Sequence, residues 1–537
     1  MGYPLHGSGV HVRPLLWVVP GLLFVFSTLT TSGRGPYYWR QNFDPEYCYL
    51  FNAVNLLTFE APGHTDHPGT TLQELGAAVI LARWWAASLV SPWQPVDRAV
   101  LEQPEAYLHT INLVLNLLFC GLLGWAGLRV LGAAGSPLPA LVFQASFLLF
   151  DEVLLAQTRV SPEPLLMAVL AALAGVMAPL LFGGYGDAGR SGAVSPVLAG
   201  AIFGFGLVTK ITFLPVAVLA WVLPEGKARL RFAGGALLAA AVLLPPIYSQ
   251  LPRVAGWLWS LVTHQERYGM GEEGVPPAAV LIDNAYRLYQ EDPYLYLSAV
   301  FFVAVLGLLF WRGEWIAGPG HRRLRRLLLA SMLGVGLSVA MTVKHYAPHY
   351  ALPAMLLVPV MMAALVAGIE SARRPARPAR TLAGAFLATT LTLALLWTAR
   401  PVPDWFISLV STREEHYALE RFLGTMADCT VVGMYRCSRQ EFALHFGNNA
   451  AGNRRTRLLN RLYPGAIHYQ VFVQPPRFEN FAYAKQDATI ARRLASGACV
   501  LLQGERESIT RLTDLAYERV GPDGREIVVK LRPPSEP

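Results

Sequence analysis

The chain has 537 residues, of which 53% are hydrophobic and only 15% charged, and its mean hydropathy is +0.37. Soluble domains carry about 25% charged residues, so this composition excludes an ordinary soluble protein and indicates a membrane protein. The formal net charge is +8 at pH 7, and the strongest clusters of Lys and Arg lie in short loops between apolar segments. Such loops report membrane topology, so the charge does not indicate nucleic-acid binding.

The first 400 residues are dominated by apolar segments long enough to span a bilayer. A spanning helix needs roughly 20 mostly apolar residues. Segments of this kind cover residues 14–31, 111–131, 164–182, 232–248, 294–311, 327–343, 350–369 and 382–398. Segment 138–150 is shorter, and segment 197–223 is interrupted by Lys210, which predicts two spans that meet at a polar tip. The sequence therefore predicts about eleven transmembrane helices.

The basic residues fix the expected orientation. With the N-terminus inside, the two strongest clusters, HRRLRR (321–326) and ARRPARPAR (372–380), both fall on the cytoplasmic side, as Lys and Arg in short loops usually do. Segment 72–90 is also long, but it contains Gln73, Glu74 and Arg83, and counting it as a span would move both clusters outside. We therefore predict an amphipathic helix at the membrane interface there.

From residue 401 the composition changes to alternating short strands and helices. REEHYALERFLGTM and DATIARRLASG have helical patterns, whereas TVVGMY, HYQVFV, CVLLQG and EIVVKL read as strands. The sequence thus predicts a membrane domain over 1–400, with a first outer loop at 32–110, and a soluble α/β domain over 401–537 on the outer side. Cys429 and Cys437 could form a disulfide there, or remain buried free thiols.

With this topology, unusual polar residues of five loops collect on the outer face. They are Asp44, Glu46, His64, Asp66 and His67; Arg159 and Glu163; Lys210; His264, Glu266, Arg267, Glu272 and Glu273; and Lys344, His345, Tyr346, His349 and Tyr350. Ionisable groups near membrane depth are costly and usually functional. Taken singly, each has a structural explanation: Arg159 could pair with Glu163, Lys210 could extend to the interface, and the histidines could simply be hydrogen-bonded.

The residue types together suit glycosyl transfer from a lipid phosphate. Arg159, Lys210, Lys344 and Arg267 are cations of the kind that bind phosphate. Asp44 is a carboxylate that could take a proton from an attacking hydroxyl. The cations would stabilise the charge that develops on the departing phosphate.

Short motifs in chain order resemble the GT-C superfamily of polytopic glycosyltransferases. The most similar branch is the protein O-mannosyltransferase and lipid A aminoarabinose transferase group (glycosyltransferase family 39-like). The matching motifs are FDPEYCYL with Asp44 and Tyr47, TDHPGTTLQ with His67 and Pro68, RVSPEP with Arg159, Pro162 and Glu163, VTK with Thr209 and Lys210, and HYALP from His349 to Pro353. Pro45 separates Asp44 from Glu46, where the family often has an adjacent acid pair, so a shared role for Glu46 stays open.

The resemblance implies an inverting transfer of a sugar from a polyprenyl-phosphate donor to a hydroxyl of a glycan, lipid or protein. Asp44, with Glu46, would act as base. Arg159, Lys210 and Lys344 would hold the donor phosphate, and His67, Glu163, Arg267, His349 and Tyr350 would contact substrate. No cofactor is certain. A divalent ion held by His67 with Asp44 or Asp66 is left open, because that ligand spacing is not diagnostic.

Residue usage rich in Ala, Arg, Leu and Pro suggests a GC-rich bacterial genome, hence a plasma-membrane protein with its site and C-terminal domain in the periplasm. Membrane lipids are expected partners, and nucleic acid is not. The main alternative is a transporter or flippase of a lipid-linked saccharide, which would use the cations but not the carboxylate. A structural subunit of an envelope complex would leave the five polar loops unexplained.

Overall fold

The computed structural model describes residues 12–39, 43–66, 68–183, 194–224, 226–311, 319–371, 404–434, 437–471, 475–512 and 515–533. The chain divides into two compact units that interleave along the sequence. Unit 1 comprises Met1–Leu29, Thr65–Leu72 and Asn112–Pro401, and unit 2 comprises Thr30–His64, Gln73–Ile111 and Val402–Pro537. The first outer loop therefore lies largely in the same unit as the C-terminal domain.

Six helices among the described residues are long and apolar enough to cross a membrane. They are Arg13–Arg34 (η1, Arg13–Trp17, with α2, Val18–Arg34), α6 (Pro104–Ala134), α9 (Pro162–Leu181), α14 (Pro293–Trp311), Arg322–Lys344 within α15 (Pro319–Lys344), and Pro348–Ser371 (η8, Pro348–Ala351, with α16, Leu352–Ser371). A seventh is reached if α11 (Gly226–Leu243) counts as one span with η5 (Pro245–Gln250) and α12 (Leu251–Thr263), across a bend of 81°. The polytopic, α-helical fold class is confirmed.

The predicted number of about eleven spans is not confirmed. Three apolar stretches form shorter helices: α7 (Pro137–Ala145) with η3 (Ser146–Leu149), α10 (Pro196–Thr209) and η4 (Ile211–Val222). Residues 382–398 lie outside the described residues. The predicted break at Lys210 is present, because Lys210 has extended dihedrals between α10 and η4. Helix α4 (Thr70–Ser88) is not one of the candidate spans, as the sequence predicted.

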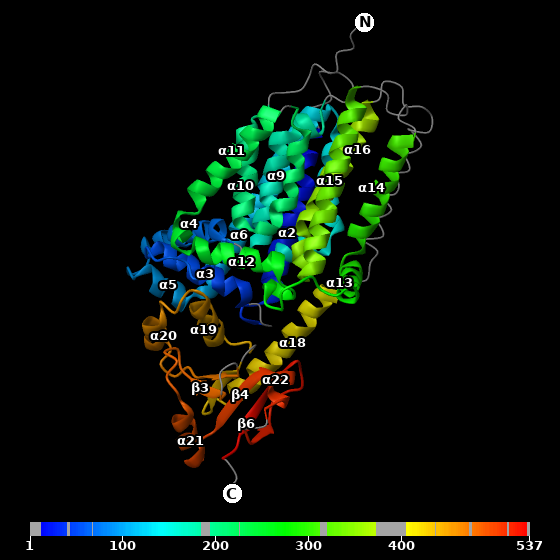
Figure 1. The fold of residues 1–537 in the computed structure, drawn as a ribbon. Helices are drawn as coiled ribbons and strands as arrows, with labels where there is room; N and C mark the ends of the chain where they lie inside the picture. The colour runs from blue at the N-terminus through cyan, green and yellow to red at the C-terminus, as the bar shows by residue number, and fades with distance from the viewer. Residues whose placement is uncertain are drawn as a thin grey trace. The chain divides into compact units, whose positions relative to one another are not determined.

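Small residues let helices of unit 1 approach closely. A Cβ on Gly200 of α10 would overlap the Phe232 carbonyl of α11, and one on Gly204 would lie 2.5 Å from the Ala236 oxygen. Gly200 and Gly204 form a GxxxG spacing, which places both on one helix face. Helix α9 packs against α10 and α16, and α16 against α15, so these helices run side by side in Figure 1. Side chains of α16 are almost all buried, which makes it a central helix of the unit.

The C-terminal part of unit 2 forms a six-stranded mixed sheet in the order β3-β2-β1-β4-β6-β5. The strands are β1 (Thr430–Met434), β2 (His468–Gln470), β3 (Arg477–Glu479), β4 (Val500–Glu505), β5 (Tyr517–Arg519) and β6 (Glu526–Leu531). Strand β1 is parallel to β2 and β4, whereas β2–β3, β4–β6 and β5–β6 are antiparallel. The predicted soluble α/β domain is confirmed.

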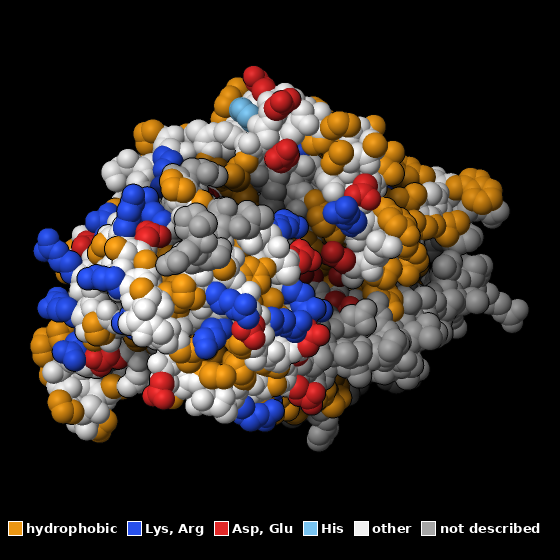
Figure 2. Space-filling view, turned by 90° about the horizontal axis from the view of Figure 1, so that it is seen from below, with side chains coloured by type: hydrophobic (Ala, Val, Ile, Leu, Met, Phe, Trp, Pro, Cys, Tyr) orange, Lys and Arg blue, Asp and Glu red, His pale blue; other side chains and the backbone are white. Residues whose placement is uncertain are grey.

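Helices join these strands, and further helices of the same unit come from the first outer loop. Helix α18 (Asp404–Thr425) precedes β1, and the helices between strands are α19 (Gln440–Ala450), α20 (Thr456–Leu462), α21 (Asp487–Ala495) and α22 (Arg506–Thr510). The helices from the first outer loop are α3 (Phe43–Leu57), α5 (Val96–Glu102) and most of α4. Figure 2 shows one face of the molecule, on which Lys and Arg side chains lie interspersed with acidic and apolar ones.

The cysteine pairing differs from the one considered from sequence. Cys429 is bonded to Cys499, and Cys437 is a buried free thiol. The physical reason is strand adjacency: the two bonded residues directly precede the paired strands β1 and β4, and the amide of Thr430 donates to the Cys499 carbonyl at 2.9 Å. Sequence spacing alone does not reveal which strands become neighbours.

Candidate active site

A buried charged pair in unit 1 joins two predicted site residues. Glu163 lies in the first turn of α9, where the helix dipole favours an acid, and Lys210 lies at the junction of α10 and η4. Their side chains form an ion pair and are only 6% and 3% exposed. Burying two charges is costly unless they are paired, so each requires the other at this position.

An aromatic and histidine group borders this pair. The Lys210 ammonium lies 4.8 Å from the centre of the Tyr350 ring, and the His349 ring lies 4.6 Å from the same ring. His349 also interacts electrostatically with Glu163. The short helix η8 therefore brings the HYALP motif to the acid of RVSPEP and the lysine of VTK, which are far apart in the sequence.

Glu152 and Asp292, two acids that the sequence analysis did not single out, belong to this group. Glu152, in α8 (Asp151–Ala156), interacts with Glu163, Arg159, Asp292 and Lys210. Burial, followed by the neighbouring Glu163 carboxylate, raises the pKa of Glu152 to about 8, while Arg159 and Lys210 act in the opposite direction. The signal that could have found Glu152 is the acid pair Asp151–Glu152 directly after an apolar segment.

Residues 65–72 of the first outer loop belong to unit 1 and reach Lys210 there. Pro68 forms an isolated backbone bridge with Lys210, and the hydroxyls of Thr71 and Thr209 share a hydrogen bond of 2.7 Å. Asp66 pairs with Arg253 at 3.4 Å, both partly exposed. The HPGTT and VTK motifs are thus brought together. His67 itself lies outside the described residues.

Lys344 has a different environment. Its ammonium donates to the carbonyls of Leu261 and Val262 at 2.9 and 2.5 Å, near the C-terminal end of α12, where a cation is favoured. Its predicted contact with phosphate stays a prediction. Arg267 begins the short helix η6 (Arg267–Gly269), and its side chain is outside the described ones.

The predicted catalytic acids lie at the start of α3 in unit 2. Asp44 is exposed and has non-helical dihedrals (φ −109°, ψ 117°), whereas Glu46 is fully buried. Tyr47 of the same motif is buried, and its hydroxyl donates to Glu105 at 2.7 Å. Burial, and then the Glu105 carboxylate, raise the pKa of Tyr47 well above its usual value. Tyr47 therefore anchors the turn that carries Asp44.

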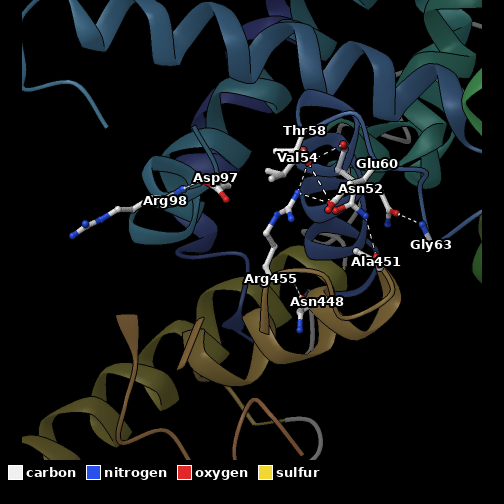
Figure 3. A network of polar contacts seen from close by, with 11 residues as sticks. Asn52, Val54, Thr58, Glu60, Gly63, Asp97, Arg98, Asn448, Ala451 and Arg455 are labelled. Carbon is white, nitrogen blue, oxygen red and sulfur yellow. Dashed lines mark hydrogen bonds and ion pairs between the residues drawn. The ribbon is translucent and has the colours of Figure 1, made fainter. Parts of the chain in front are cut away.

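The far end of α3 is held by the C-terminal domain through the polar network of Figure 3. Arg455 forms an ion pair with Glu60 at 2.7 Å and also donates to the Thr58 hydroxyl. Asn55 donates to the carbonyl of Ala451 at 2.9 Å. These contacts attach residues 55–60 of the first outer loop to the segment between α19 and α20.

A metal site is not assembled from the described side chains. Among them, no group of three or more His, Cys, Asp or Glu residues could hold an ion. Since His67 lies outside this set, the divalent ion considered from sequence stays open.

Taken together, these features define a polytopic membrane protein with a buried charged cluster in its helical unit and a soluble mixed-sheet domain. No protein-family model and no curated protein matches the chain.

Two solved structures are similar to it: ArnT from Cupriavidus metallidurans bound to undecaprenyl phosphate, and the same protein in the apo state. Each is 13% identical to this chain. The first comparison covers 96% of this chain and 97% of the other with a TM-score of 0.48, and the second covers 97% and 98% with a TM-score of 0.47. Both are members of the aminoarabinose transferase group that the motifs resemble. At this identity and TM-score, no residue role is transferred from them.

Proposed function

We propose that the protein is an integral-membrane glycosyltransferase that moves a sugar from a polyprenyl-phosphate donor to a hydroxyl acceptor with inversion. The observation that carries the proposal is the buried cluster in unit 1, in which Lys210 is paired with Glu163 and lies over Tyr350. Three separate parts of the chain supply these groups, which favours a ligand site over a local helix-end ion pair.

The donor phosphate is assigned to Lys210 with Arg159. An ammonium has three protons to donate, and the Glu163 contact uses one of them, so two remain for phosphate oxygens. Arg159, which acts on Glu152 in the same cluster, would supply a second cation with a planar donor fork. Lys344 would be a weaker contributor, because two of its protons are directed at α12.

Asp44 is assigned as the general base. It is exposed, whereas Glu46 is fully buried, so Asp44 is the acid of the motif that can meet a substrate. In the proposed reaction Asp44 takes the proton of the acceptor hydroxyl, and that oxygen attacks the anomeric carbon from the side opposite the phosphate. The bond from the anomeric carbon to the phosphate oxygen breaks, and polyprenyl phosphate leaves with the electron pair.

The reaction is placed at the outer face of a bacterial plasma membrane, with a glycan, lipid or protein as acceptor. The Cys429–Cys499 disulfide supports an extracytoplasmic C-terminal domain, since disulfides persist in oxidising compartments such as the periplasm. The positions of the basic clusters in the sequence support the same orientation.

The test is sugar release from polyprenyl-phosphate sugars by the purified full chain in nanodiscs, with donor binding measured on the same samples. We expect Asp44→Asn to lower turnover at least a hundredfold, as loss of a general base should, while donor affinity stays within about threefold. Asp97→Asn, which changes an acid of α5 in the same unit, is the control and should retain turnover.

A wild-type protein that binds lipid-linked sugar but turns over none with hexosyl or pentosyl donors and glycan, lipid and peptide acceptors would favour the transporter. Accelerated movement of the labelled lipid-linked sugar across liposomes would then identify that alternative.

A further inference from the structure

His345 lies one residue beyond the end of α15, and the proposed transfer assigns it no role. The residue is buried, with an exposed fraction of 7%. Its Nδ1 atom lies 2.5 Å from the carbonyl oxygen of Glu266, and its Nε2 atom lies 2.6 Å from the carbonyl oxygen of Leu261. Both nitrogens of one imidazole ring therefore meet backbone carbonyls of the segment around the end of α12, and all three residues belong to unit 1.

Hydrogen-bonding chemistry determines which form of the His345 ring fits this arrangement. A carbonyl oxygen can only accept a hydrogen bond, whereas a neutral imidazole carries one N–H and one lone pair. A neutral His345 would direct that lone pair at a carbonyl oxygen, whichever of the two tautomers it adopted. The doubly protonated imidazolium donates to both carbonyls. The two contacts therefore form together only when His345 carries a positive charge.

The end of α12 is a favourable place for such a charge. Leu261 lies in the last turn of α12, where the backbone carbonyls form the negative end of the helix dipole. The Lys344 ammonium uses the same feature, since it donates to the carbonyls of Leu261 and Val262. Because Lys344 opposes a second positive charge beside it, the second proton of His345 depends on the two hydrogen bonds that the ring donates.

The Glu266 carbonyl belongs to a strained turn. Glu266 and Tyr268 have positive φ values of 59° and 63°, which are uncommon for residues with a Cβ. Backbone hydrogen bonds between residues 263–265 and 271–274 close the turn. Backbone strain persists only where the surroundings fix it. The contact from His345 is made to the carbonyl of one of the two strained residues, so it is placed to hold the turn in this conformation.

We propose that His345 is a pH-sensitive lock on the turn formed by residues 264–274. In its charged form the ring joins Glu266 to the end of α12. When the pH rises and the ring loses one proton, one carbonyl loses its donor and the turn is released. The stability that the lock contributes is therefore present at low pH and lost as the pH rises. Histidine ordinarily changes charge between pH 5 and 8, which places the release in the same range.

The other titratable and charged groups on neighbouring elements define the controls. They are Arg253 of α12; His264, Glu266, Arg267, Tyr268, Glu272 and Glu273 of the turn; Asp283, Tyr286, Arg287, Tyr289 and Glu291 of α13 (Ala278–Glu291); Asp292; Tyr294 and Tyr296 of α14; Lys344 and Tyr346 beside the ring; His349 and Tyr350 of η8; and Glu370 of α16.

Two further histidines are the groups of this set whose residue type ordinarily titrates near neutral pH. The His264 ring is engaged elsewhere, because its Nδ1 atom lies 2.8 Å from the Thr263 hydroxyl oxygen. The His349 ring packs against Tyr350. Replacing either of them should leave the lock in place.

The experiment is backbone hydrogen exchange, followed by mass spectrometry, on the full chain in nanodiscs at pH 5.5 and pH 8.0. Each rate is divided by the rate of an unstructured peptide at the same pH. We expect peptides within 258–274 to be about tenfold less protected at pH 8.0, because a hydrogen bond from a charged group is lost. Residues 162–181 of α9 are the internal reference and should not change.

The decisive variant is His345→Gln, whose side chain has the same charge at both pH values. In this variant the protection of 258–274 should no longer depend on pH. His264→Gln removes a histidine of the turn itself and is the matched control, which should keep the wild-type pH dependence.

A second measurement does not require His345→Gln to fold. Deuterium exchange at the C2 carbon of an imidazole ring reports the protonation of that ring. In His349→Gln, His345 is the one histidine between residues 265 and 415, so its peptide reports it alone. The midpoint of its pH profile should coincide with the pH at which the turn loses protection.

The proposal is overturned if the turn is equally protected at both pH values, or if His345→Gln keeps the wild-type pH dependence. It is also overturned if His264→Gln abolishes the pH dependence, or if the His345 ring changes charge at a pH where the protection of the turn stays constant. No lipid-linked donor is present in these measurements, so their result does not depend on whether the protein transfers a sugar.

Discussion

Gly63 lies where the first outer loop meets the C-terminal domain, and its replacement by alanine tests that packing. An alanine Cβ at this position would lie 2.6 Å from the Ala451 carbonyl carbon, 2.7 Å from the Ala450 oxygen and 2.8 Å from the Gly452 nitrogen. Non-bonded carbons normally approach only to about 3.5–4.0 Å. All three neighbours are backbone atoms, so no side-chain rotation can relieve the overlap.

The magnitude follows from the required displacement. The two segments must separate by about 1 Å, and overpacking of this kind costs about 1–3 kcal/mol. The hydrogen bond from the Gly63 amide to Asn52, at 2.6 Å, and that from Asn55 to the Ala451 carbonyl would be strained as well. A local loss of about 2–3 kcal/mol corresponds to roughly 30- to 150-fold more frequent opening.

Hydrogen exchange measured by mass spectrometry on the full chain is the appropriate assay, because a two-unit membrane protein does not unfold in one step. Peptides covering 52–64 and 447–456 should exchange faster in Gly63→Ala by that factor. Gly424→Ala, in α18, is the control, since a Cβ there meets nothing within 4 Å. Equal protection of both peptides in Gly63→Ala and wild type would refute the close packing of these segments.

Three further outcomes follow from the contacts. Lys210→Met combined with Glu163→Gln, which removes both charges of the buried pair, should weaken binding of polyprenyl phosphate at least tenfold in a titration, whereas exposed Lys227→Met should not. The double variant Cys429→Ser, Cys499→Ser removes a disulfide between residues 70 positions apart, which should lower the free energy of unfolding of the domain by about 4 kcal/mol. The amides of β1 and β4 should then exchange faster. Added reductant should speed their exchange in wild type but not in the double variant. Burial lowers the pKa of His445 from 6.5 to about 4. As the pH is lowered, His445 therefore binds its proton in the unfolded domain before it does so in the folded domain. The folded domain loses stability as the pH falls from 6.5 toward 4. In His445→Gln, the loss of hydrogen-exchange protection between pH 7 and pH 5 should be smaller than in wild type. An unchanged pH dependence in this variant would mean that other groups cause the loss.

Periodicity and residue type were sufficient for some parts of this structure. Apolar length identified the six spanning helices, and the single Lys210 within a long apolar stretch located the break between α10 and η4. Strand and helix patterns located most of the C-terminal domain. These features are local, since each depends on residues within one segment.

What the sequence could not provide depends on neighbours in space. The Cys429–Cys499 pairing follows from the adjacency of β1 and β4, which no spacing reveals. Glu152 was passed over because its environment is created by Glu163, Arg159 and Lys210, residues of other segments. The grouping of the first outer loop with the C-terminal domain in unit 2 is likewise a property of packing.

That grouping bears on whether the C-terminal domain is a removable module. Gly447 of α19 packs directly on α3, because a Cβ there would lie 2.8 Å from the Tyr47 carbonyl and 2.7 Å from the Phe51 ring. Tyr47 and Phe51 are fully buried, so removing residues 402–537 would expose an apolar face of the helix that begins with Asp44.

We therefore expect a chain ending at residue 401 to lose order in α3 as well as the domain itself. Hydrogen exchange of residues 43–64 in the truncated and full chains measures this, and residues 162–181 of α9 in unit 1 serve as the internal reference. If 43–64 stay as protected as in the full chain while α9 is unchanged, α3 is held by its own contacts, such as Tyr47 with Glu105. If 43–64 lose protection and α9 does not, the domain is required to form the turn that presents Asp44.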